Sequence, residues 1–185
     1  MKRVLVAMIG ALVASVVIPQ TALAEETVCR STIKNKTLDN VKVPQGADCT
    51  LKNLRVKGTI NVNNNARLEA INVRVIGNVQ GESARNVIVR KTSNVGGSVQ
   101  VVQSAKGKVV NSKINGDILF DEQTGRVVIK RNNVGGSVQA FQNDGGVRVK
   151  GNTIDGNLQC KENTPAPTGG NNEVHESKED QCRNL

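Results

Sequence analysis

A short motif recurs six times along this 185-residue chain at an almost constant interval. Each copy has a central glycine with an aliphatic residue two positions before it and another two positions after it. The central residues are Gly58, Gly77, Gly97, Gly116, Gly136 and Gly156, so successive copies lie 19 or 20 residues apart. A fixed period of this length over six units is typical of a solenoid, in which each unit buries its apolar residues by stacking on its neighbours.

The residues within each repeat predict β-strands. Apolar and polar residues alternate around the glycine, which indicates a strand with one buried face, and a second aliphatic strand comes before it in most repeats. Asparagine tolerates left-handed backbone and bonds to its own turn, so we expect it at the corners between strands. The corner asparagines are Asn53, Asn72, Asn94, Asn111, Asn132 and Asn152. Helical periodicity is missing, and the pattern predicts an all-β parallel helix of about six coils.

Two groups of residues carry a resemblance to a known architecture. The repeats Gly-Ser-Val-Gln-Val at 97–101 and Gly-Ser-Val-Gln-Ala at 136–140 resemble those of single-stranded right-handed parallel β-helices, the pectate-lyase-like architecture. The segments 156–160, 163–170 and 180–182 resemble the ends of small secreted bacterial β-helix proteins of unassigned function. The resemblance covers about residues 37–160 and implies a right-handed parallel β-helix (solenoid) without an assigned activity.

The first 24 residues have the pattern of a secretory signal peptide. Lys2 and Arg3 precede an apolar run of 15 residues, and Ala22-Leu23-Ala24 supplies a small-x-small cleavage site. The run is shorter than the about 20 residues of a membrane-spanning helix. We therefore expect cleavage after Ala24, a secreted or periplasmic protein, and no transmembrane anchor. The expected segments of the mature chain are an N-terminal cap with a partial coil (25–49), the parallel β-helix (50–160) and a loosely ordered, Pro/Gly/Asn-rich C-terminal cap loop (161–185).

Four cysteines lie at the margins of the repeats, and in an exported protein an even number predicts disulfides. Six coils stacked at the strand spacing of about 4.8 Å separate the two ends by roughly 25–30 Å. A disulfide needs Cα atoms within about 7 Å, so the expected pairs are Cys29–Cys49 and Cys160–Cys182, each fixing a cap to one end. The chain has no Cys-x-x-Cys and one histidine, His175. We expect no metal and no cofactor.

One candidate surface is a ladder of carboxamides three residues after each glycine. Its members are Asn61, Gln80, Gln100, Gln139 and Gln159, and Leu119 interrupts it. Stacked amides bond along such a ladder, so it either stabilises the coils or forms a binding face for a glycan, ice or another copy of the chain. A regular lattice such as ice is disfavoured by Leu119.

The second candidate surface is basic. Residues 50–160 contain 16 lysines and arginines against 7 aspartates and glutamates. This excess either keeps the protein soluble or attracts a polyanion such as an acidic polysaccharide or lipopolysaccharide. The candidate polyanion-binding residues are Arg55, Arg74, Lys91, Lys113, Arg131 and Lys150. Nucleic acid is disfavoured, because the chain has no Trp or Tyr and only two Phe on which bases could stack.

Catalysis has little support in the sequence. A polyuronate lyase of the resembled architecture would need calcium-binding aspartates on adjacent coils, but Asp117, Asp121 and Glu122 all fall in one coil. Hydrolysis would need two carboxylates across a groove, and no long loop could build its walls. The sequence predicts a non-catalytic scaffold that self-associates; the alternative is a binding module for an acidic polysaccharide or other envelope component, with a polysaccharide lyase less favoured.

Overall fold

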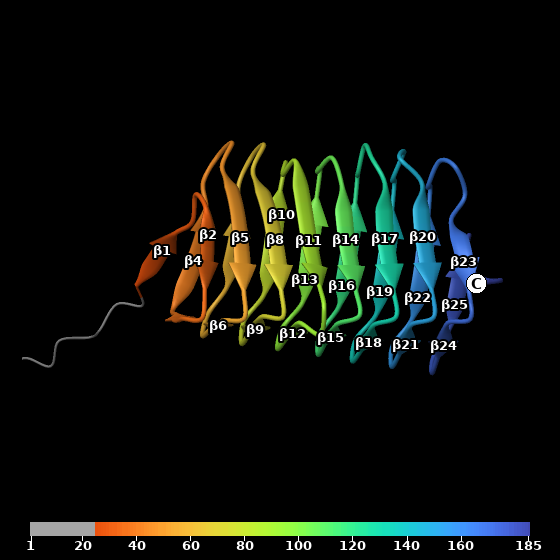
Figure 1. Cartoon of the computed structure of the whole chain (residues 1–185). Coiled ribbons are helices and arrows are strands. Elements are labelled where there is room, and N and C mark those ends of the chain that lie inside the picture. Colours follow the sequence, from red (N-terminus) through yellow and green to blue (C-terminus); the bar gives the residue numbers. More distant parts are fainter. Residues whose placement is uncertain (1–24) are drawn as a thin grey trace, which may run out of the picture.

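The computed structural model describes residues 25–185, and over this range the chain winds into a parallel β-helix with three strands per turn (Figure 1). The leader predicted at 1–24, with its cleavage site, lies outside the described residues. Within 25–185 all regular structure is β, and no helix occurs that could cross a membrane.

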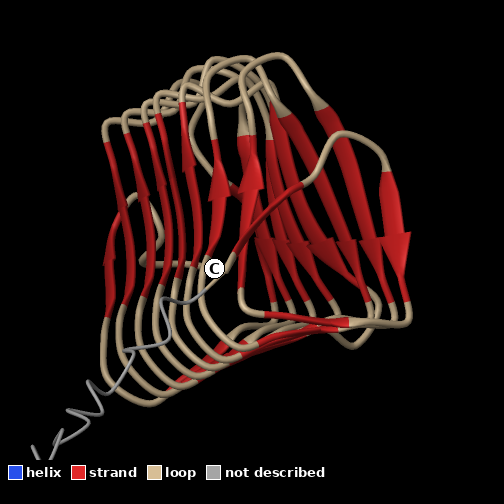
Figure 2. Ribbon diagram, turned by 90° about the vertical axis from the view of Figure 1, so that its left-hand side faces the viewer, coloured by secondary structure: helices blue, strands red, loops and turns tan. Residues whose placement is uncertain are grey.

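Equivalent strands of successive turns pair in parallel and form three sheets, which make the three sides of the coil (Figure 2). Sheet A contains β1 (Glu26–Val28), β4 (Asn40–Val43), β7 (Ile60–Val62), β10 (Val79–Glu82), β13 (Val99–Val102), β16 (Ile118–Asp121), β19 (Val138–Phe141), β22 (Leu158–Lys161) and β25 (Lys178–Asp180). Sheet B contains β2 (Thr32–Lys34), β5 (Asp48–Lys52), β8 (Arg67–Ile71), β11 (Asn86–Arg90), β14 (Gly107–Val110), β17 (Val127–Lys130), β20 (Val147–Lys150) and β23 (Thr168–Gly170). Sheet C contains β3 (Thr37–Leu38), β6 (Arg55–Val56), β9 (Arg74–Val75), β12 (Asn94–Val95), β15 (Lys113–Ile114), β18 (Asn133–Val134), β21 (Thr153–Ile154) and β24 (Glu173–Val174).

The solenoid has about seven turns, close to the six predicted from the glycine motif. The difference lies at the ends. Residues 161–185, expected to be a loosely ordered loop, instead carry β23, β24 and β25, which continue all three sheets. This last turn lacks the motif, since Glu176 stands where the earlier turns have glycine. It nevertheless keeps the register, since Lys178 pairs with Leu158 of the turn before.

The motif glycine is required where the chain turns from sheet C into sheet A. The N–H of Gly77 donates to the carbonyl of Gly58 at 3.0 Å, and the same bond joins each later pair of motif glycines. A Cβ atom at Gly77 would lie 2.7 Å from Oγ1 of Thr59 and 2.8 Å from the carbonyl oxygen of Gly58. In the turns that carry the motif, neighbouring turns therefore approach too closely here for a side chain, and the last turn, with Glu176 at this place, departs from this packing.

The interior is a column of aliphatic side chains that point inward from all three sheets. Phe120 is the largest of the fully buried side chains. Gly107 faces it from sheet B, and a Cβ atom at Gly107 would overlap the Phe120 ring. The missing side chain at one position thus makes room for the bulky one, which keeps the interior closely packed.

The asparagines predicted at corners occupy three different positions. Asn53, Asn72 and Asn111 do lie at the corner between sheets B and C, with φ angles of 49–51°. Asn94 instead belongs to β12 on sheet C. Asn132 and Asn152 also lie between a strand of sheet B and a strand of sheet C, but their side chains are buried. Nδ2 of Asn132 donates to Oδ1 of Asn152 at 3.0 Å, and Nδ2 of Asn152 donates to Oδ1 of Asn172 at 2.9 Å.

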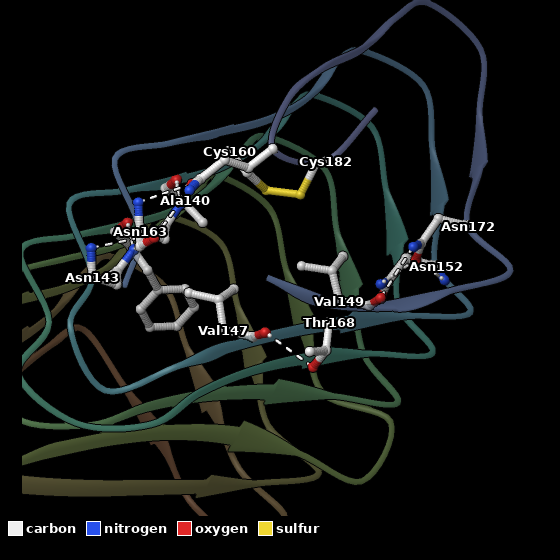
Figure 3. The surroundings of a disulfide bond; sticks show 12 residues. Ala140, Asn143, Val147, Val149, Asn152, Cys160, Asn163, Thr168, Asn172 and Cys182 are labelled. Carbon is white, nitrogen blue, oxygen red and sulfur yellow. Dashed lines mark hydrogen bonds between the residues drawn. A yellow bond between two sulfur atoms is a disulfide. The ribbon is translucent and has the colours of Figure 1, made fainter. Parts of the chain in front are cut away.

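Both predicted disulfides are present and each joins neighbouring turns at one end of the solenoid. The Cα atoms are 5.5 Å apart in Cys29–Cys49 and 5.2 Å apart in Cys160–Cys182, and all four cysteines are fully buried. Cys49 pairs in register with Leu68, as the period predicted. Figure 3 shows Cys160–Cys182 beside Asn163, whose Nδ2 donates to the carbonyl of Ala140 at 2.8 Å. The disulfides thus close the first and last turns onto the interior.

Candidate polyanion-binding surface

Sheet A brings the predicted carboxamide ladder into one column on its outer face. Nε2 of Gln80 donates to Oε1 of Gln100 at 3.3 Å, and Nε2 of Gln139 donates to Oε1 of Gln159 at 2.9 Å. Asn61 pairs in register with Gln80. Leu119 lies between Gln100 and Gln139 in the column and divides it into two segments. The amides bond mainly to one another, which is what a ladder that stabilises the coils would do.

A second polar column follows the motif glycines and contains Asp117, one of the carboxylates considered for catalysis. In this column each side-chain oxygen accepts the backbone N–H of the equivalent residue one turn later. Oγ of Ser98 accepts from Asp117 at 2.9 Å, and Oδ1 of Asp117 accepts from Ser137 at 2.7 Å. Asp117 therefore links three turns, through its backbone N–H to the turn before and through its carboxylate to the turn after.

A second carboxylate on this face, Asp121, is partly buried between its neighbours in the sheet, Val102 and Phe141. Burial, followed by the negative charge of Glu122, raises the pKa of the Asp121 carboxyl. Its Oδ1 atom is buried and has no hydrogen-bond partner among residues 25–185. Over the same residues, no cluster of three or more His, Cys, Asp or Glu side chains could hold a metal ion.

The six basic residues singled out from the sequence do not form one surface. Arg55, Arg74 and Lys113 lie in one column on the outer face of sheet C. Lys91 and Arg131 occupy the left-handed corner between sheets B and C, with φ angles of 57° and 54°. Lys150, at the end of β20, lies on the third surface, the outer face of sheet B.

The densest positive surface is the outer side of three successive strands of sheet B, β14, β17 and β20. We call this surface the basic face; it consists of Lys106, Lys108, Arg126, Lys130, Arg148 and Lys150. In one column, Lys108 and Arg148 flank Val128, and in the next, Lys130 pairs with Lys150. Adjacent turns are about 4.8 Å apart, so each turn adds its positive charges to those of the next.

The charges of the basic face are not neutralised by the protein itself. None of its six side chains forms an ion pair within the described range. Residues 106–115, 126–135 and 145–154, which build this part of sheets B and C, contain no Asp or Glu. The positive charge of Arg131, then burial and the charges of Arg148, Lys150 and Lys108, lower the pKa of Lys130. The lysines and arginines thus lie close enough to repel one another.

The N-terminal half of sheet B is different, because its three arginines, Arg67, Arg85 and Arg90, are paired. Glu69 accepts from Arg67 at 3.0 Å and from Arg90 at 2.7 Å, and Arg85 pairs with Asp48 at 2.5 Å. Burial opposes ionisation of Glu69, but the hydrogen bonds and charges of Arg90 and Arg67 outweigh it and hold the pKa of Glu69 below its usual range. Lys34 and Lys52, which pair in register in this half, form no ion pair within residues 25–185, so the N-terminal half keeps two unpaired charges in its strands against the six of the basic face.

Sequence reasoning missed Lys106, Lys108 and Arg126 as members of one surface. The signal was present, because 106 and 126, 108 and 148, and 130 and 150 are separated by one or two periods of 20. Arg55, Arg74 and Lys113 were easier to recognise, because they precede the motif glycine by a few residues and therefore lie on sheet C, next to the glycine. Comparison of the chain with protein-family models, curated proteins and solved structures finds no match. A functional proposal for this protein therefore depends on the β-solenoid and on the basic face.

Proposed function

We propose that the protein is an exported, non-catalytic β-helix scaffold that binds a polyanion, such as an acidic polysaccharide of the cell envelope, through the basic face. The observation that carries the proposal is the run of unpaired lysines and arginines across three successive turns. Such a surface attracts a polyanion over a distance and gains free energy when the polymer releases its counterions. A flat, repetitive face suits an extended polymer better than a single small molecule.

The proposed location is secreted or periplasmic, after removal of residues 1–24. Two disulfides support it, since disulfides persist in oxidising compartments outside the cytoplasm. Glycan enzymes of this architecture use carboxylates in a groove, whereas the Asp117 carboxylate is engaged between turns and the Asp121 carboxylate is partly covered. The chemistry of the surface supports binding and not bond cleavage.

The test compares two triple variants with the same change in net charge. Lys108→Gln/Lys130→Gln/Lys150→Gln removes three charges from the basic face, and Arg55→Gln/Arg74→Gln/Lys113→Gln removes three from sheet C. We expect the first variant to bind immobilised dextran sulfate about tenfold more weakly than the second, from three exposed ionic contacts. Binding of the unchanged protein should weaken steadily as salt is added.

Equal binding by the two triple variants would contradict the proposal, because net charge alone would then explain it. No binding to dextran sulfate or polygalacturonate at low salt would do the same. The second candidate is self-association end to end, which is favoured by the terminal strands β1 and β25, each paired on one side only. Salt-insensitive oligomers that grow with protein concentration, measured by sedimentation velocity, would support this candidate in place of polyanion binding.

A further inference from the structure

A small notch opens at the edge of the basic face, where the chain turns from sheet A into sheet B. Its volume is about 160 Å³. Three successive turns contribute to it: Arg126 before β17, Gly145, Gly146 and Arg148 at the start of β20, and Pro165, Ala166 and Thr168 from the last turn. It is the place where the otherwise flat basic face borders a concave surface.

The two glycines of the notch are fixed by the stacking of the turns. A Cβ atom at Gly145 would overlap the backbone of Gly125 in the turn before, and Gly146 has a φ angle of 82°, which side chains disfavour. The carbonyl of Gly146 accepts the N–H of Val127 at 3.0 Å. The N–H groups of Gly145 and Gly146 donate to no backbone or side-chain acceptor among residues 25–185. Two successive N–H groups beside a left-handed residue form a concavity that suits an anion.

Two arginines line the notch together with these glycines. Arg126 and Arg148 both line the notch, and neither takes part in an ion pair within the described part of the chain. Arginine presents several N–H donors in a planar fork that matches the oxygens of a carboxylate, sulfate or phosphate group. Asp and Glu are missing from the lining, so it offers no carboxylate to a cation, whereas its two arginines can donate hydrogen bonds to an oxyanion.

We infer that this notch is a specific oxyanion site that takes one carboxylate, sulfate or phosphate group of the ligand. The inference rests on the proposed function, and it adds that the polymer is held in register by one anchored group while the remaining lysines contact it along the basic face. Arg126 and Arg148 donate hydrogen bonds to the oxygens of this group, and the backbone N–H groups of Gly145 and Gly146 donate to it as well. The basic face alone would let a polyanion slide; the notch fixes its position.

The experiment follows the backbone amides of the oxidised protein by ¹H–¹⁵N NMR. Sodium sulfate, and separately sodium acetate, is added at constant ionic strength with sodium chloride as the balance. We expect saturable shifts of the Gly145 and Gly146 resonances with one of the two salts, and the salt that saturates identifies the type of oxyanion. Arg126→Gln should weaken this binding about tenfold, as expected for loss of a charge-assisted hydrogen bond.

Lys106→Gln is the matched control, because Lys106 occupies the place of Arg126 one turn earlier but does not line the notch. Unchanged glycine shifts with both salts, or equal losses in Lys106→Gln and Arg126→Gln, would overturn the anchor site. The two proposals fail separately. If dextran sulfate binds but neither salt moves the glycines, the notch is refuted and the polyanion-binding function stands. If the salts saturate the notch but no polyanion binds, the proposed function is refuted instead.

Discussion

At the scale of single residues, the alternation of inward and outward side chains determines what each position tolerates. Val99 is fully buried, whereas the next residue, Gln100, takes part in the ladder on the outer face of sheet A. Asp121 is an exception to this division, because its carboxylate is on the outer face and is still partly buried. It lies on the outer face, yet its neighbours Val102 and Phe141 partly cover it and leave one carboxylate oxygen without a partner.

Asp121→Asn is therefore expected to stabilise the protein at neutral pH. Because burial and Glu122 raise its folded-state pKa, Asp121 favours folding most when protonated, below its unfolded pKa of about 3.9. That contribution is lost as the pH rises through the folded pKa. The gain in urea midpoint from Asp121→Asn should accordingly be present at pH 7 and shrink towards pH 3.

Glu82→Gln makes the same chemical change on the exposed part of sheet A and serves as the control. Its effect on the urea midpoint should be small at both pH values, as expected for an exposed surface substitution. A loss of stability at pH 7 in Asp121→Asn would show that the ionised carboxylate has a favourable partner after all.

At the scale of the strand and its corner, a shift of one residue decides whether an asparagine is exposed or buried. The left-handed corner residue points outward and the residue after it points inward. In an early turn these are Asn53 and Leu54, and in a later turn they are Arg131 and Asn132. The inward slot is apolar in the early turns and holds amides in the later ones, where Asn132, Asn152 and Asn172 bond to one another.

Asn152→Ala should be among the most damaging polar substitutions in the chain. Oδ1 of Asn152 accepts the N–H of Asn132, and its Nδ2 donates to the carbonyl of Ile129 at 3.1 Å. Removing the amide leaves buried groups without partners, at a cost of about 2–4 kcal/mol of unfolding free energy. Urea denaturation would measure this loss. Asn94→Ala, on the outer side of β12, should cost well under 1 kcal/mol, and comparable losses in the two variants would contradict the buried ladder.

The sequence was sufficient to predict the parallel sheets, because the motif glycine, its aliphatic neighbours and the period of 19 or 20 together specify which residues stack. It was not sufficient for the inward asparagines. Asn53 and Asn132 look alike in sequence, and only the backbone conformation of the residue before Asn132 turns its side chain inward. The last turn was missed because it lacks the motif: Glu176 replaces the glycine, and Lys178 replaces the aliphatic residue two positions after it. A terminal turn packs against a neighbour on one side only, so it depends less on these residues.

The basic face could be predicted only in part for a similar reason. Lys150 was singled out, but Lys106 and Arg126 lie at a corner whose length varies between turns, so their common surface emerges only after stacking. The notch was beyond the sequence altogether. Its lining comes from three turns, and the open N–H groups of Gly145 and Gly146 depend on which carbonyls the neighbouring turn presents.

At the scale of the whole molecule, the strands of each turn pair only with those of the turns next to it, so damage at one end should stay there. Replacing Cys160 and Cys182 by serine opens a loop of 22 residues, for which chain entropy predicts a loss of about 3 kcal/mol. Hydrogen exchange should show lost protection in β23, β24 and β25 while β5 and β8 stay protected. Replacing Cys29 and Cys49 should instead lower the protection of β1, β2 and β3 while β17 and β20 stay protected. Loss of protection throughout after either change would argue for a single cooperative unit.

The regular winding also has a consequence for how the chain reaches this structure. Most backbone bonds between turns join residues 18–21 apart, so each new turn closes a loop of nearly the same size and meets nearly the same entropic cost. No turn has to wait for a partner from the far end of the chain. Once two turns have formed, the rest can be added one at a time, as in a zipper, and the formed part always offers the template for the next strand.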